Sequence, residues 1–197
     1  TLARGLYAWV TGRMTDAEDF LSQAIHLNPL LDEGYEALAQ LEANRRNFEQ
    51  SILWRTEGLS NDRGYLPHLE GRGLVRFFWG MSEKNKMEDP ISHFRLAMKD
   101  YKAATVMDSE RGKAWLNSAL INMHWGTHLQ AQGKDGTSHF ETALLELEEA
   151  SRRSPDLVQI GLAEGNLHMH LGLHRQQSEE NPEEKYQQAM NVLNKVI

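Results

Sequence analysis

Apolar residues recur at intervals of three and four along the chain, the spacing that places side chains on one face of an α-helix. Near the N-terminus, Leu6 and Trp9 follow this spacing until Gly12 interrupts it. A second amphipathic stretch covers residues 16–27 and closes before Pro29, because the residue preceding a proline avoids helical backbone. The pattern predicts two helices joined by a short turn, which is a helical hairpin.

The later part of the chain repeats itself at a fixed step. Trp79-Gly80 recurs 46 residues later as Trp125-Gly126, and Leu171-Gly172 follows after the same step. Three further sets keep the step: Ala97, Ala143 and Ala189; Phe94, Phe140 and Tyr186; Gly73, Ala119 and Gly165. A fixed period is typical of stacked repeats, in which each unit buries its apolar face against its neighbours. The approximate units are 1–31, 32–64, 65–109, 110–155 and 156–197.

The last three hairpins are longer than the first two by about twelve residues each. The extra residues fall between the two helices when one glycine of each long hairpin is aligned with Gly12: Gly80, Gly126 and Gly172. A capping dipeptide precedes each expected second helix: Asp89-Pro90, Asp135-Gly136 and Asn181-Pro182. If each helix gains about six residues, the long hairpins extend about 9 Å further.

The hairpins resemble the tetratricopeptide repeat, a helix-turn-helix of about 34 residues with small residues at fixed positions and a closing proline. The first hairpin carries the resemblance through Gly5, Gly12, Ala17, Ala24 and Pro29. In the second hairpin, residues 44–47 replace the glycine turn and residues 61–64 replace the closing proline. The resemblance implies one all-α domain, an α-solenoid of about five stacked hairpins in a right-handed superhelix.

Composition narrows the class of partner. The chain has no cysteine, which excludes disulfides and thiolate chemistry and suits a cytoplasmic location. A formal charge of −7 disfavours nucleic acid and favours basic or apolar peptides. No apolar run reaches the length of a membrane span. Both ends stop within helical patterns, so we expect a fragment of a longer protein whose uncapped ends allow self-association.

The nine histidines are the unusual feature of the composition. His124 and His128 form an i, i+4 pair, and His170 and His174 repeat the pair one step later. Such a pair can hold a metal ion, but the third hairpin lacks it and no glutamate follows as in the zinc-protease motif. We expect His124 to lie near His170 and His128 near His174, without a metal or other cofactor.

The sequence contains no motif of an enzyme. There is no glycine-rich phosphate loop and no nucleophile motif, and the acidic cluster of Glu146, Glu148 and Glu149 is expected on a solvated face. The long hairpins from Tyr65 onward look like repeats found C-terminal to the catalytic domain of some bacterial serine/threonine protein kinases, but the kinase motifs are missing. We therefore expect a non-catalytic chain.

The tetratricopeptide resemblance implies that first helices line a concave groove that binds a peptide or partner protein. The family's inward positions are Leu6, Trp9, Val10, Gln40, Asn44, Leu74, Phe77, Phe78, Leu120, Met123, His124, Asn166, Met169 and His170. Their apolar character suits an apolar segment better than a carboxylate clamp, which requires lysine and arginine. Two alternatives stay open: a regulatory or dimerising region of a kinase, and a metal-dependent hydrolase supported only by the histidines.

Overall fold

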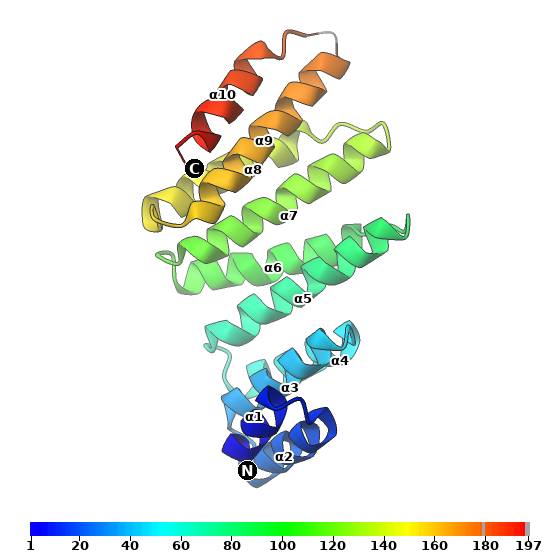
Figure 1. Cartoon of the computed structure of the whole chain (residues 1–197), viewed down its shortest axis with the longest axis vertical. Coiled ribbons are helices and arrows are strands. Elements are labelled where there is room, and N and C mark those ends of the chain that lie inside the picture. Colours follow the sequence, from blue (N-terminus) through cyan, green and yellow to red (C-terminus); the bar gives the residue numbers. More distant parts are fainter. Residues whose placement is uncertain (179, 196–197) are drawn as a thin grey trace. The chain divides into compact units, whose positions relative to one another are not determined.

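The computed structural model describes residues 1–178 and 180–195, and the regular structure of these residues is entirely α-helical (Figure 1). Consecutive helices pair into five hairpins. The helices are α1 (Leu2–Val10), α2 (Met14–Leu27), α3 (Asp32–Asn44), α4 (Phe48–Asn61), α5 (Leu66–Asn85), α6 (Ile91–Met107), α7 (Gly112–Ala131), α8 (Thr137–Arg153), α9 (Val158–Gln177) and α10 (Glu183–Leu193). The predicted all-α fold of helical hairpins is confirmed.

The chain divides into two compact units, Thr1–Met107 and Asp108–Ile197. In the N-terminal unit, hairpins stack through α2 against α3 and α4 against α5, while first helices meet at α1–α3 and α3–α5. In the C-terminal unit, α8 packs on α9 and the first helices α7 and α9 also meet. Each unit therefore has the stacking of a helical repeat.

The extra length of the long hairpins is divided unequally between the two helices. Helix α5 has 20 residues where α3 has 13, and α6 has 17 where α4 has 14. The expected equal gain of about six residues per helix is therefore wrong. The extended first helix reaches about 10 Å further than its short counterpart.

The alignment of three glycines with the turn residue Gly12 is also wrong. Gly80, Gly126 and Gly172 lie inside the first helices, facing a large ring of the partner helix. A Cβ atom on Gly80 would stand 2.9 Å from the ring of Phe94, closer than packed atoms tolerate. These glycines allow close approach of two helices and form an additional packing level.

The turns of the long hairpins follow the capping prediction. Two residues before each second helix, a side-chain oxygen accepts a hydrogen bond from the first helical N–H: Asp89 from Ile91 at 3.0 Å, Asp135 from Thr137 at 2.8 Å, and Asn181 from Glu183 at 2.9 Å. Each bond satisfies one of the free donors at a helix start. The three dipeptides therefore mark the starts of the second helices, as predicted.

Two of the long hairpins place an acid between their helices at one repeated position. Asp100 of α6 accepts hydrogen bonds from Arg72 at 2.7 Å and Arg76 at 2.5 Å, both on α5. One step later, Glu146 of α8 accepts from Ser118 at 2.5 Å and Asn122 at 2.8 Å, both on α7. Ser118 and Asn122, which are neutral donors, thus take the positions that Arg72 and Arg76 hold one step earlier.

The expectation that Glu146 lies on a solvated face is wrong. Its carboxylate is buried enough between α7 and α8 that desolvation raises its pKa, although the bonds from Ser118 and Asn122 oppose this effect. His139 belongs to the same cluster, because its Nδ1 lies 2.9 Å from Asn122 Oδ1. Glu146 therefore contributes to the contact between the two helices.

Candidate functional site

A groove of about 380 Å³ in the N-terminal unit contains three residues predicted from the sequence, Gln40, Asn44 and Phe78. It lies between the first helices α3 and α5, with the start of α4 at its edge. The remaining lining residues are Ala43, Arg46, Phe48, Val75, Met81, Ser82 and Asn85. We call this site the N-terminal groove.

The groove arises from the step in hairpin length. Helix α3 ends at Asn44, at the level that Phe78 occupies in the longer α5, so residues 79–85 extend beyond α3. This extension supplies Met81 and Asn85 to the lining. Phe78 lies where this extension begins and is 51 % exposed.

Hydrogen-bonding neighbours fix the side-chain amide of Gln40 in the groove. Gln40 Nε2 donates to Asn44 Oδ1 at 3.1 Å, and Arg55 Nη2 lies 3.5 Å from Gln40 Oε1. Arg55 is buried, where desolvation lowers its pKa, and it also donates to the backbone oxygen of Pro67 at 3.1 Å. These contacts orient the Gln40 amide toward the groove.

The edge of the groove carries a positive charge. Arg46 stands in the turn between α3 and α4 with a φ of 61°, a left-handed conformation that is uncommon outside glycine. Phe48, the first residue of α4, has its ring 6.1 Å from that of Trp79 on α5. None of these described lining residues carries a carboxylate. The groove therefore offers apolar contact, amide hydrogen bonds and one cation.

Other residues predicted for the binding surface of the N-terminal unit lie outside the groove lining. Leu6, Val10 and Leu74 are exposed, on α1 and α5. Trp9 is half-buried and packs against the cores around Ala8 and Leu21, and Phe77 lies between the rings of Phe78 and Phe94. Trp9 and Phe77 therefore serve helix packing.

In the C-terminal unit, one predicted site residue is buried. Met123 is 5 % exposed and belongs to the hydrophobic core, so its assignment to a partner-binding surface is corrected. Leu120 is partly buried against the same core, while Asn166 and Met169 are exposed on α9. Of these four residues, only Asn166 and Met169 can contact a partner without displacing core contacts.

Histidines of the C-terminal unit contact residues of several elements. The half-buried His124 lies on α7, where His128 Nε2 is 2.9 Å from the Gln132 amide, and His170 stacks on Phe140 with ring centroids 6.3 Å apart. The expected side-by-side arrangement of the histidine pairs stays a prediction. Within the described residues, no group of three or more His, Asp or Glu side chains could hold a metal ion.

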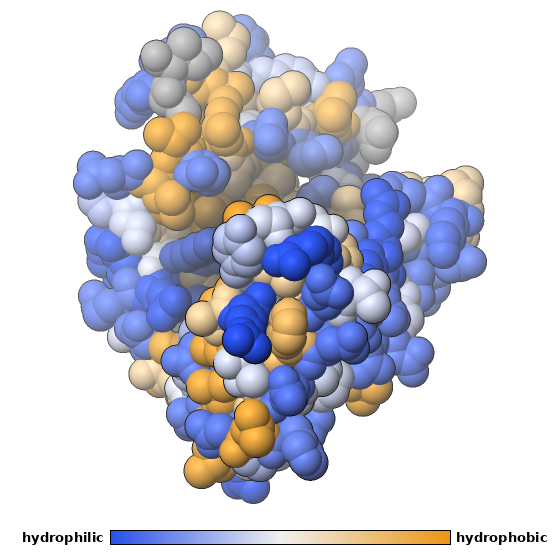
Figure 2. Space-filling model, turned by 60° about the horizontal axis from the view of Figure 1, so that its bottom comes forward, coloured by the Kyte–Doolittle hydropathy of each residue, from blue (hydrophilic) through white to orange (hydrophobic). Residues whose placement is uncertain are grey.

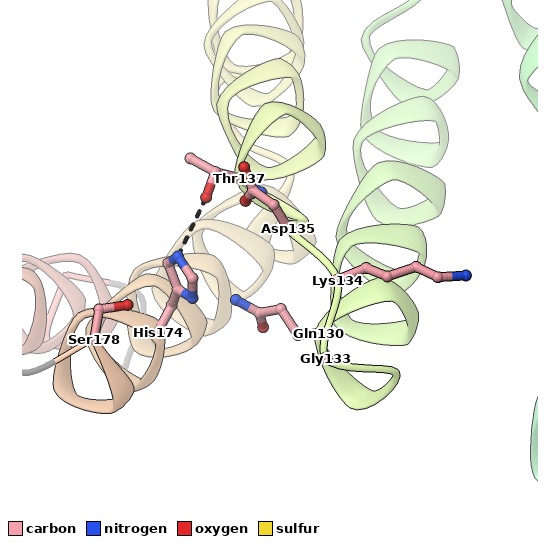
Figure 3. A pocket seen from close by; sticks show the side chains of 7 residues that line it. All are labelled: Gln130, Gly133, Lys134, Asp135, Thr137, His174 and Ser178. Atoms are coloured by element: carbon pink, nitrogen blue, oxygen red, sulfur yellow. Dashed lines mark hydrogen bonds between the residues drawn. The ribbon is translucent and has the colours of Figure 1, made fainter.

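His174 lies in a small pocket at the tips of the last two hairpins. Figure 3 shows His174 and Gln130 directed into the same space, with Lys134 pointing away from it. His174 Nε2 is 3.3 Å from the hydroxyl of Thr137, at the start of α8. This histidine therefore contacts the second helix of the preceding hairpin.

The sequence did not identify Phe48, Val75 and Met81 as groove residues. The binding positions implied by the repeat family all lie on one face of the first helices. Phe48 instead comes from a second helix, and Met81 comes from the extension of α5. The unequal hairpin length was visible in the sequence and was the signal that could have located this groove. None of the described helices is both long and apolar enough to cross a membrane.

Solved structures of other proteins share the fold of this chain. No family model matches the sequence, and no curated protein matches it. The crystal structure of MamA protein superposes with a TM-score of 0.70 at 12 % identity, covering 98 % of this chain and 90 % of MamA. A tetratricopeptide repeat protein from Parabacteroides merdae ATCC 43184 gives 0.71 at 14 % identity, covering all of this chain and 64 % of that protein.

A thermophilic protein of the same repeat class from Thermus thermophilus gives a TM-score of 0.64 at 16 % identity, with 99 % and 87 % of the two chains covered. Sequence identity this low shows the fold and nothing further. The chain has the tetratricopeptide-repeat fold.

Proposed function

We propose that this tetratricopeptide-repeat chain is a non-catalytic protein-interaction scaffold whose N-terminal groove binds an apolar segment of a partner protein. The observation that carries the proposal is the half-exposed ring of Phe78 at the step between a short and a long hairpin. Covering the exposed half of a phenylalanine contributes about 2 kcal/mol, enough to make it an anchor point.

The dimensions and polarity of the groove suit a side chain with its adjoining backbone. A volume of about 380 Å³ is at the lower end of ligand pockets, which favours insertion of one or two apolar side chains. The amides of Gln40 and Asn44 can donate to and accept from the backbone of an extended segment. Methionine, here Met81, adapts its shape to different apolar partners.

Peptide selection followed by binding measurements tests the proposal. Peptides are selected from a random library on the purified chain, and their affinities are measured by calorimetry for the parent and for Phe78→Ser. Leu53→Ser is the matched control, because Leu53 is 53 % exposed on α4 and does not line the groove. We expect peptides with an apolar anchor to lose about tenfold or more in affinity for Phe78→Ser. Equal affinities for the two variants, or no selected peptide, would refute the proposal.

A further inference from the structure

A second groove, in the C-terminal unit, combines leucines with acidic groups. It has a volume of about 370 Å³ and lies between α8 and α9. Leu145 is 64 % exposed there, beside Leu144 and Leu147. Glu148 and Ser151 of α8 and Glu164 and His168 of α9 complete the lining. We call this site the α8–α9 groove.

The α8–α9 groove has two acidic residues in its lining, Glu148 and Glu164. In the described part of the chain, neither Glu148 nor Glu164 pairs with a lysine or arginine. Glu164 Oε1 is 3.9 Å from His168 Nε2, too far for a hydrogen bond. Among the described residues, the two carboxylates therefore lie beside the leucines without a lysine or arginine partner.

His168 is the most buried polar residue of the groove wall. Its side chain lines the groove and the residue is only 8 % exposed. Among the described residues, its buried Nδ1 has no hydrogen-bond partner. A buried polar atom without a partner costs about 1–3 kcal/mol, so His168 is held in the groove wall by packing and not by a hydrogen bond of this nitrogen.

The corresponding groove of the N-terminal unit has the opposite character. It lies between α4 and α5 and is lined by Thr56, Leu59, Ser60, Arg63, Leu69 and Arg72. Two 46-residue steps separate Thr56 from Glu148 and Arg72 from Glu164. The α4–α5 contact therefore packs without acidic residues at these positions. Glu148 and Glu164 are thus a particular feature of the α8–α9 groove and not a requirement of helix packing.

We propose that the α8–α9 groove binds a basic, apolar segment of a partner protein, in which leucine-like side chains contact Leu144 and Leu145 and lysine or arginine pairs with Glu148 and Glu164. Charge complementarity selects this partner, because an acidic segment would be repelled by both carboxylates. The α8–α9 groove belongs to the C-terminal unit and the N-terminal groove to the other unit. Each of the two proposals can therefore be tested without the other.

Two synthetic amphipathic helices serve as probes: one of leucine and lysine, and one with glutamate replacing lysine. Binding to the full chain is measured by fluorescence anisotropy. We expect the leucine–lysine helix to bind, and its affinity to fall about five- to tenfold in the double variant Glu148→Gln, Glu164→Gln. Equal binding of the leucine–glutamate helix would contradict the proposal.

Matched variants separate a specific site from general attraction to a chain of charge −7. The double variant Asp19→Asn, Glu57→Gln removes the same charge from exposed positions of the N-terminal unit. Leu145→Ser is compared with Leu53→Ser, the position two repeat steps earlier. The proposal requires weaker binding only in the variants of the α8–α9 groove, with unchanged melting curves. Equal losses in the control variants, or loss of binding in Phe78→Ser, would overturn it.

Discussion

Close approach of the two helices in a hairpin depends on a small residue facing a large one. Gly73 faces the ring of Tyr101, and a Cβ atom there would stand 2.9 Å from it. Ala119 holds the same position one step later and is fully buried in the core that contains Leu147. A small residue recurs here at the 46-residue step, as Gly73, Ala119 and Gly165.

Enlarging Ala119 is expected to separate α7 from α8. We expect Ala119→Leu to lower the free energy of unfolding by about 1–3 kcal/mol, because the added atoms have no space in a packed core. Ala131→Leu on the same helix is the control, since Ala131 is exposed at the end of α7. Urea denaturation measures both variants, and equal midpoints would contradict the packing described.

His68 links the stability of the N-terminal unit to pH. The side chain is fully buried, with its ring 4.8 Å from that of Tyr65, and its Nε2 lies 3.5 Å from Asp32 Oδ1. Burial, assisted by the charge of Arg55, lowers the pKa of His68 from 6.5 to about 4. Folding therefore keeps this imidazole neutral in a pH range where the unfolded chain protonates it.

Acidification from pH 6.5 toward 4 is expected to destabilise the protein through His68. Only the unfolded state gains the proton in this window, so the free energy of unfolding falls as the pH falls, by up to about 3 kcal/mol. Urea denaturation across this range is compared between the parent and His68→Phe. The variant should lose part of the pH dependence, and identical pH profiles would show that His68 does not contribute.

Within the described residues, the turns of four hairpins contain a left-handed residue: Gly12, Arg46, Met87 and Gly133. Two of these positions carry side chains despite φ values of 61° at Arg46 and 66° at Met87. A left-handed conformation costs a non-glycine residue about 1 kcal/mol. The sequence could not identify Met87 as a turn residue, because methionine gives no signal for this conformation.

Replacing Met87 by glycine is expected to stabilise the third hairpin. Met87→Gly removes the steric cost of about 1 kcal/mol, but glycine gains more freedom in the unfolded chain. We expect a net gain of up to about 0.5 kcal/mol in the free energy of unfolding. Lys86→Gly, at an ordinary φ of −89°, is the control and should not stabilise. A lower thermal midpoint for Met87→Gly than for the parent would refute this account.

Sequence periodicity predicted the helices and their pairing because amphipathic spacing and capping residues are local signals. The predicted equal division of the extra residues was wrong, because Gly80 resembles a turn glycine in the sequence but lies inside α5 and packs against Phe94. The polar contacts of Asp100 and Glu146 were also missed. Their partners change from arginine to serine and asparagine along the repeat, so no residue type marks the position.

For the whole molecule, each unit carries a groove of distinct chemistry. The N-terminal groove has an exposed aromatic ring, amides and Arg46, without a carboxylate among its described lining residues. The α8–α9 groove has leucines with Glu148 and Glu164. The net charge of −7 led us to expect basic or apolar partners. We propose an apolar partner segment for the N-terminal groove and a basic, apolar one for the α8–α9 groove. Figure 2, which brings the N-terminal hairpin forward, shows apolar side chains in small patches among polar ones.

A partner-binding groove at the step between the second and third hairpins is tested by NMR chemical shifts of the isotope-labelled chain, titrated with a selected peptide. We expect the largest shift changes at Gln40 and Asn44, in the turn at residues 45–47, and from Val75 to Asn85. Shift changes confined to α7–α10, or spread evenly over the chain, would contradict it.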